Sequence, residues 1–126
     1  METMLTIAAA ASAAGVTVDT LRYYEKVGLV ARVARSPSGH RRYGEADVAW
    51  VKFLRKLHAT GMPIRVMQQY ARLARRGEPA APERRALLEA HRREVITRVA
   101  ELQDIVKLLD HKLALYDAPR EQPAAG

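Results

Sequence analysis

The most constraining feature of this sequence is a long stretch near its C-terminal end, Glu83 to Asp117, that contains neither Gly nor Pro. Within it, large apolar or aromatic side chains recur at every seventh position, at Leu88, Val95, Leu102, Leu109 and Tyr116. The second apolar position of the same repeat holds Val99, Val106 and Leu113, with Arg92 as its exception. Apolar residues repeated over four heptads predict one helix of a coiled coil. A lone helix cannot bury this seam, so the stretch needs a partner.

Two arrangements would cover the apolar side chains of this helix. A second copy of the chain can pair with the heptad seam, or the helix can fold back on the N-terminal part of its own chain. A second apolar strip, Ile105, Leu108 and Leu115, suits the fold-back arrangement. The heptad pattern itself favours a homodimer, and the predicted dimer interface consists of Leu88, Val95, Val99, Leu102, Val106, Leu109, Leu113 and Tyr116.

The clearest break in the chain precedes this helix, at GEPAAP, residues 77–82. Gly and Pro so close together stop one helix and form a hinge before the next. The last residues, 118–126, contain two further Pro and are expected to form a flexible tail. The sequence therefore divides into a domain over residues 4–76, a hinge over 77–82, a dimerisation helix over 83–117 and a tail over 118–126.

The N-terminal domain begins with two short helices. Thr6 is suited to cap a helix from Ile7 to about Ala14, whose alanines favour helix and permit close packing. A tight turn follows at Gly15, and Thr17 is suited to cap a second helix that ends near Gly28. Two short helices joined by a turn that contains Gly are typical of a helix-turn-helix.

Further along, two more helices are expected, from about Gly44 to Gly61 and from Pro63 to Arg76. Between the second and third helices lies a basic stretch, Leu29 to Tyr43, with a Ser-Pro-Ser-Gly turn in its middle. This stretch predicts a small β hairpin beside the helix-turn-helix. The fold class is thus all-α with a small β wing: a winged helix-turn-helix domain followed by a long coiled-coil dimerisation helix.

The net charge of +7 is unevenly distributed along the chain. Residues 1–78 carry thirteen Lys or Arg and six Asp or Glu, whereas residues 79–126 carry eight of each. The whole positive excess therefore belongs to the predicted winged helix-turn-helix. Such an excess is what neutralisation of DNA phosphates requires.

Several classes of function are excluded by composition. The sequence has no Cys, which excludes disulfides, thiolate metal sites and a cysteine nucleophile. No apolar run reaches the length of a membrane span, so we expect a cytoplasmic protein without membrane contact. The sequence also lacks a glycine-rich phosphate loop and a cluster of His and carboxylates within one element, so it does not predict an enzyme or a cofactor.

One stretch carries a more specific signal, TVDTLRYYEKVGLV at residues 17–30, followed by R-S-x-x-G-x-R-x-Y ending at Tyr43. This order resembles the beginning of the MerR family of bacterial transcription regulators. The resemblance covers the first helix, the recognition helix, the wing and the helix after it, about two thirds of the chain. It implies a homodimer joined by an antiparallel coiled coil. It further implies binding to a pseudo-palindromic site in promoter DNA, which the dimer bends and untwists for RNA polymerase.

The residues predicted to contact DNA lie on three elements. Major-groove contacts are expected from the second helix, through Thr17, Thr20, Arg22 and Tyr23, because Arg can bond guanine bidentately and Tyr can bond phosphate. Wing contacts are expected from Arg35, Arg41 and Arg42. Tyr43 either bonds a phosphate or seats the wing on the third helix. Arg65, in the first turn of the fourth helix, is placed to hold phosphate together with that helix end.

The effector is less constrained. Soft-metal sensors of the family carry cysteines near the end of the dimerisation helix, which this sequence lacks, so a small organic molecule, a metal bound through oxygen or nitrogen, and no effector remain open. Trp50, His58 and Tyr70 could line an effector pocket or pack as part of the core. His91 and His111 would approach each other in an antiparallel dimer, but no third metal ligand is evident, so we interpret both as solvated.

A rival hypothesis is a DNA-architectural, excisionase-like winged-helix protein without direct control of a promoter. The long dimerisation helix argues against it, because such small factors usually lack one. The position of the binding site relative to the promoter elements would distinguish the two.

Overall fold

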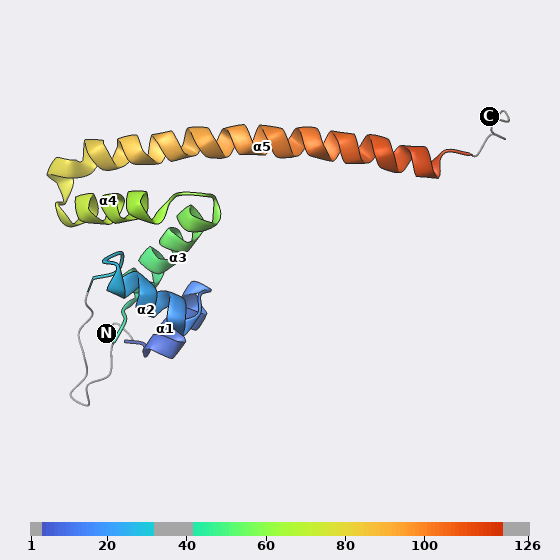
Figure 1. Ribbon diagram of the computed structural model, residues 1–126. Helices are drawn as coiled ribbons and strands as arrows, with labels where there is room; N and C mark the ends of the chain where they lie inside the picture. Colours follow the sequence, from blue (N-terminus) through green and yellow to red (C-terminus); the bar gives the residue numbers. More distant parts are fainter. Residues whose placement is uncertain (1–3, 32–41, 120–126) are drawn as a thin grey trace. The chain divides into compact units, whose positions relative to one another are not determined.

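The computed structural model describes residues 4–31 and 42–119, and this part of the chain is almost entirely helical (Figure 1). Its elements are α1 Ile7–Ala14, α2 Val18–Lys26, α3 Glu45–Ala59, α4 Ile64–Arg75, the short 3-10 turn η1 Glu78–Ala80, and α5 Ala81–Asp117. The predicted all-α architecture with a long final helix is confirmed. The tip of the predicted wing, residues 32–41, lies outside the described residues.

The chain forms two compact units, residues 1–88 and residues 89–126. The boundary therefore falls inside α5, between Leu88 and Glu89, and not at the Gly- and Pro-containing residues 77–82. Residues 77–82 do not separate the units. They form η1 and the first turn of α5, which begins at Ala81, two residues earlier than expected.

Hydroxyl and carboxylate side chains fix where the first helices begin. The Thr6 hydroxyl accepts a hydrogen bond from the amide of Ala9 at 3.2 Å, and the Thr17 hydroxyl accepts one from the amide of Thr20 at 3.0 Å. The Asp47 carboxylate accepts a hydrogen bond from the Gly44 amide at 2.8 Å at the start of α3. Each bond satisfies an amide that the helix itself leaves free.

Glycines end the helices of the first unit. Gly15, Gly28 and Gly61 follow α1, α2 and α3 with φ angles of 75°, 82° and 98°. These are left-handed conformations, which residues with a Cβ adopt only with strain. The turn positions predicted from the glycines are confirmed.

An isolated antiparallel bridge ties the start of the chain to the end of the wing region. Leu5 and Tyr43 exchange two backbone hydrogen bonds, of 2.7 and 2.8 Å. The bridge brings the return of the wing region next to the N-terminus of α1. It also fixes the direction in which the chain enters α3.

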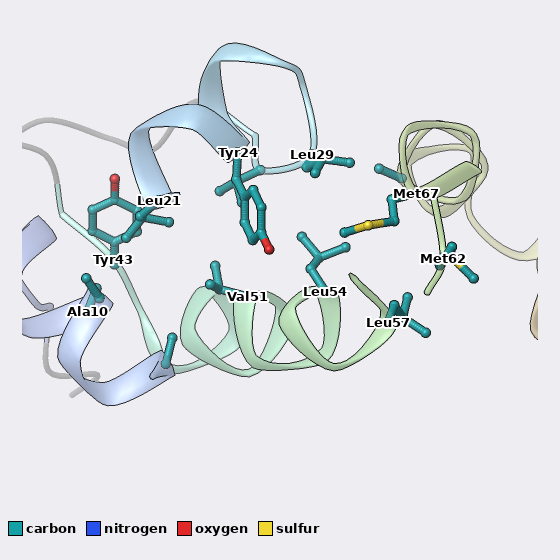
Figure 2. Packing of buried hydrophobic residues seen from close by; sticks show 14 residues of the cluster. Ala10, Leu21, Tyr24, Leu29, Tyr43, Val51, Leu54, Leu57, Met62 and Met67 are labelled. Atoms are coloured by element: carbon teal, nitrogen blue, oxygen red, sulfur yellow. The ribbon is translucent and has the colours of Figure 1, made fainter. Parts of the chain in front are cut away.

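The core of the first unit is aliphatic with two buried tyrosines (Figure 2). Leu21 and Tyr24 of α2 point toward Val51 and Leu54 of α3, and Met67 of α4 closes the cluster. α1 packs on α2 and α3, and α3 packs on α4. Alanines of α1 allow this close packing because their side chains are small. Ala10 and Ala11 are each only 2% exposed.

The second unit, by contrast, has its apolar side chains at the surface. The exposed large side chains of α5 are Ile96, Val99, Leu102, Ile105, Val106, Leu108, Leu109, Leu113, Leu115 and Tyr116. The strip suggested for folding back, Ile105, Leu108 and Leu115, is 50%, 55% and 60% exposed. Within residues 4–31 and 42–119, no helix has the length and apolar character of a membrane span.

Two residues at the N-terminal end of the predicted seam differ from those that follow. Leu88 packs against the core of the first unit, and Val95 is half-buried. The seam that stands in solvent therefore starts at Val99. Whether Leu88 also takes part in a dimer interface stays a prediction.

Candidate nucleic-acid interface

α2 has one buried side and one exposed side. Leu21 is 0% exposed and Tyr24 is 3% exposed, whereas Arg22 and Lys26 are exposed and Tyr23 is 46% exposed. Residues 19, 22, 23 and 26 follow helical spacing and form one continuous outer stripe. This stripe places a guanidinium, a phenol and an ammonium group in solvent on a helix whose opposite side is fixed in the core.

The two threonines at the start of α2 are already hydrogen-bonded to each other. The Thr17 hydroxyl donates to the hydroxyl oxygen of Thr20 at 2.9 Å while accepting from the Thr20 amide. Thr17 is exposed and Thr20 is half-buried. Their first role is therefore to hold the N-terminus of α2, and a DNA contact by either would share the same oxygen atoms.

Tyr24 belongs to the core rather than to the DNA surface. Burial raises the pKa of its hydroxyl above the ordinary value, and the nearby Arg55 guanidinium opposes that rise in pKa. Arg55 of α3 also lies beside the turn of the helix-turn-helix, because a Cβ at Gly15 would be 3.8 Å from its Cζ atom. Arg55 is exposed, so it adds positive charge next to this turn.

The predicted wing residues are divided between described and undescribed parts of the chain. Arg35 and Arg41 lie outside the described residues. Arg42 is half-buried at the base of the wing region. Tyr43 is 0% exposed, and its hydroxyl donates to the Glu25 carboxylate of α2. The structure thus places Tyr43 inside the first unit, not at its surface, because the bridge with Leu5 turns its side chain inward.

α4 contributes a basic outer face. Arg65, Arg72 and Arg76 are exposed at helical spacing, and the stretch 64–76 contains no acidic residue. Arg65 follows the N-terminus of α4, where no side chain caps the free amides. Arg65 is therefore presented in solvent as the sequence suggested, next to the positive end of the helix dipole.

The three residues considered for an effector pocket do not come together. Trp50 and Tyr70 stack on each other with ring centroids 5.8 Å apart, and Phe53 lies 5.9 Å from Tyr70. His58 is exposed. A shallow hollow of about 230 Å³ is lined by Trp50 but by neither Tyr70 nor His58. Trp50 and Tyr70 therefore pack α3 against α4, in agreement with the interpretation of these residues as part of the core.

The two histidines of α5 differ in environment. His91 is 8% exposed, so it is not a solvated histidine, whereas His111 is exposed. Among the residues the structure describes, no three His, Cys, Asp or Glu side chains are grouped so that they could hold a metal ion. A metal site shared between two chains stays untested.

Sequence reasoning missed the side chains that hold the end of α2. Gln68 and Arg75 of α4 donate hydrogen bonds to the carbonyls of Val27 and Gly28, and Trp50 donates to the carbonyl of Leu29 at 2.8 Å. The available signal was weak: Gln68 is half-buried, whereas its neighbour Gln69 is exposed. Long polar side chains on such positions usually bond backbone groups of a neighbouring element.

A helix-turn-helix with a basic outer face, followed by a long helix with an apolar seam, defines a class of DNA-binding regulator. Comparison with known proteins identifies the family. The family model "MerR HTH family regulatory protein" matches residues 5–73, and the model "MerR, DNA binding" matches residues 48–112. The chain belongs to the MerR family of DNA-binding transcription regulators, as the LRYYE motif and the wing pattern indicated, and not to a class of enzymes.

Individual relatives agree with this assignment. An uncharacterised HTH-type transcriptional regulator of Haemophilus influenzae is 36% identical over 111 residues, which cover 88% of this chain and 82% of the relative. The crystal structure of HiNmlR, a MerR family regulator lacking the sensor domain and bound to promoter DNA, superposes with a TM-score of 0.83 at 35% identity, covering 91% of each chain. A MerR family regulator from Listeria monocytogenes has a TM-score of 0.84 at 36% identity, covering 90% of this chain and 86% of its own.

Proposed function

We propose that this regulator acts as a homodimer that binds a pseudo-palindromic promoter site and distorts the spacer DNA for RNA polymerase. In this proposal, α2 enters the major groove in each half-site and α5 joins the two copies. The observation that carries the proposal is the two-sidedness of α2. Its inner residues are fully buried while Arg22, Tyr23 and Lys26 remain in solvent, so the helix is held rigidly with a reading face outward.

The contact residues of the proposal fall into two groups. Arg22 is suited to read guanine, because its guanidinium is exposed in the middle of α2 and can bond two acceptors of one base. Tyr23, Arg42 and Arg65 are suited to hold phosphates, which fixes the register without reading sequence. Tyr43 supports this surface from within through its bond to Glu25.

The exposed seam of α5 supports the dimer. Val99, Leu102 and Val106 are 46%, 55% and 54% exposed, and they lie on one side of the helix. So much apolar surface on one face of a helix marks an interface with another chain. The heptad spacing selects a second copy of α5 as the partner, since identical helices present identical seams.

Any effector of this regulator would be bound without thiolates, since the sequence contains no cysteine. We propose a small molecule, or a metal with oxygen and nitrogen ligands, that shifts the dimer between two arrangements on the DNA. The crystallised relative HiNmlR is described as lacking the sensor domain and as bound to promoter DNA. This chain is likewise expected to bind promoter DNA.

Run-off transcription combined with footprinting tests the proposal. Chelator-treated protein and bacterial RNA polymerase would be added to the promoter regions next to the regulator's own gene. Protection of the spacer between the two promoter elements, together with a change in transcript level, would support promoter control. Protection outside promoters with unchanged transcript levels would favour a purely architectural protein.

A further inference from the structure

The backbone just after the recognition helix is bonded in two directions. We call residues 27–30 the linking segment, because they lead from α2 toward the predicted wing. All four of its N–H groups donate back to carbonyls of α2. The distances are 3.0 Å from Val27 to Tyr23, 3.1 Å from Gly28 to Glu25, 2.8 Å from Leu29 to Tyr24 and 3.2 Å from Val30 to Tyr24.

The carbonyl groups of the linking segment face the opposite way. Three successive carbonyls accept hydrogen bonds from side chains of the two following helices. Gln68 of α4 donates to Val27 at 2.9 Å, Arg75 of α4 donates to Gly28, and Trp50 of α3 donates to Leu29 at 2.8 Å. The N–H groups of the linking segment therefore bind it to α2, and its carbonyl groups bind it to α3 and α4.

This arrangement goes beyond what closing a helix requires. Carbonyls at a helix end are normally satisfied by water or by local turns. Here the three donors come from residues 41, 47 and 21 positions away in the chain. Leu29 and Val30 are also buried, at 1% and 3% exposed, and Leu29 points into the core between Tyr24 and Met67 (Figure 2). The segment is thus fixed by both backbone and side chain.

We propose that Gln68, Arg75 and Trp50 are positioning residues for DNA recognition. They set the angle at which the chain leaves the recognition helix, and so they determine whether α2 and the wing can reach the same stretch of DNA together. This inference rests on the proposed function, in which both elements contact one half-site. Binding groups must be held within a fraction of an ångström by supporting hydrogen bonds to act together.

A matched pair of double variants tests the proposal. Gln68→Leu with Arg75→Met removes two of the donors while keeping similar side-chain size. Gln69→Leu with Lys56→Met also replaces one amide and one cation by apolar side chains, with the same loss of charge, at exposed positions outside the proposed interface. Affinity for the footprinted operator and for random DNA of equal length would be measured by fluorescence anisotropy at several salt concentrations.

We expect the first variant to lose about tenfold in its preference for operator over random DNA relative to the second. Its affinity for random DNA and its salt dependence should match those of the control, because both variants lose one positive charge. Hydroxyl-radical footprints should lose protection where the wing lies and keep it where α2 lies. The variant Arg75→Lys, which can still donate to the Gly28 carbonyl, should recover part of the preference.

Two results would overturn the inference. One is an equal operator preference in the two double variants. The other is an equal loss on operator and random DNA with a shallower salt dependence, which would make Arg75 a phosphate contact. If the double variant does not fold, the single variants Gln68→Leu and Arg75→Met carry the test, each with an expected loss of about threefold. A wild-type protein that shows no operator preference would instead refute the proposed function.

Discussion

Leucines on the apolar faces of helices are buried in the first unit and exposed in the second. Leu54 of α3 is 0% exposed in the first unit, whereas Leu102 of α5 is 55% exposed in the second. In the first unit, helices at different angles cover each other's apolar sides. In the second, a single helix carries a seam of exposed apolar side chains.

The first unit has a core of its own, whereas the apolar side chains of the second unit are exposed. The first unit buries its core within one chain, so its stability should not depend on protein concentration. Helices in water gain most of their stability from packing of an apolar face, not from helix propensity. The second unit should therefore depend on association, and its stability should rise with protein concentration.

The largest effect is expected from Leu102→Glu at the middle of the α5 seam. In an antiparallel pair centred there, the change removes two buried leucines and places two carboxylates near each other. Losing the leucines alone costs roughly 3–6 kcal/mol per dimer, which raises the dissociation constant by at least about a hundredfold. Sedimentation velocity over a range of concentrations would show a monomer.

The control for this variant is Gln103→Glu, which adds the same charge one position away from the seam. It should sediment as the wild type does. If Leu102→Glu remained dimeric at micromolar concentration, the coiled-coil assignment would be wrong, and the stability of the second unit would not depend on pairing through this seam.

A second pair of variants separates the two units directly. Leu54→Ala leaves a cavity in a fully buried site and should lower the free energy of unfolding by about 2–5 kcal/mol at any protein concentration. Leu109→Ala, on the seam, should lower stability by an amount that shrinks as the wild-type dimer is diluted toward monomer. Urea unfolding at two concentrations a hundredfold apart would measure both.

Much of the first unit could be predicted because its determinants are local. Thr6 and Thr17 cap helices through bonds that span three residues, and Gly15 and Gly28 end helices where a positive φ is needed. Each of these signals is complete within a few residues of sequence. The heptads of α5 are likewise a local pattern, although a pattern of this kind does not reveal that Leu88 packs on the first unit.

The features that could not be predicted depend on residues far apart in the chain. The inward placement of Tyr43 follows from its bridge to Leu5 and its bond to Glu25, and both partners are distant in sequence. The bond from Arg75 to Gly28 spans 47 residues. Arginine is equally common on solvated helix faces, so its identity alone does not reveal such a partner.

An intermediate effect is expected from Arg22→Ala on the outer face of α2. If Arg22 reads a base, operator binding should weaken by about 1–3 kcal/mol while random DNA is bound nearly as before. Dimerisation and thermal stability should not change, because the side chain is exposed and belongs to the first unit. Titration of operator and random DNA at one salt concentration would measure this, and an equal loss on both would make Arg22 a phosphate contact.

The smallest effect is expected from Thr17→Ala, and it distinguishes two roles of one hydroxyl. Loss of the cap on α2 should cost about 1 kcal/mol of stability, independent of protein concentration. Thr17→Ser keeps the oxygen atom and should restore most of it. Because the hydroxyl is bonded to Thr20 within the chain, operator affinity measured well below the unfolding temperature should change little. A loss of operator affinity in Thr17→Ala with unchanged thermal unfolding would instead show that the hydroxyl serves DNA first and the helix second.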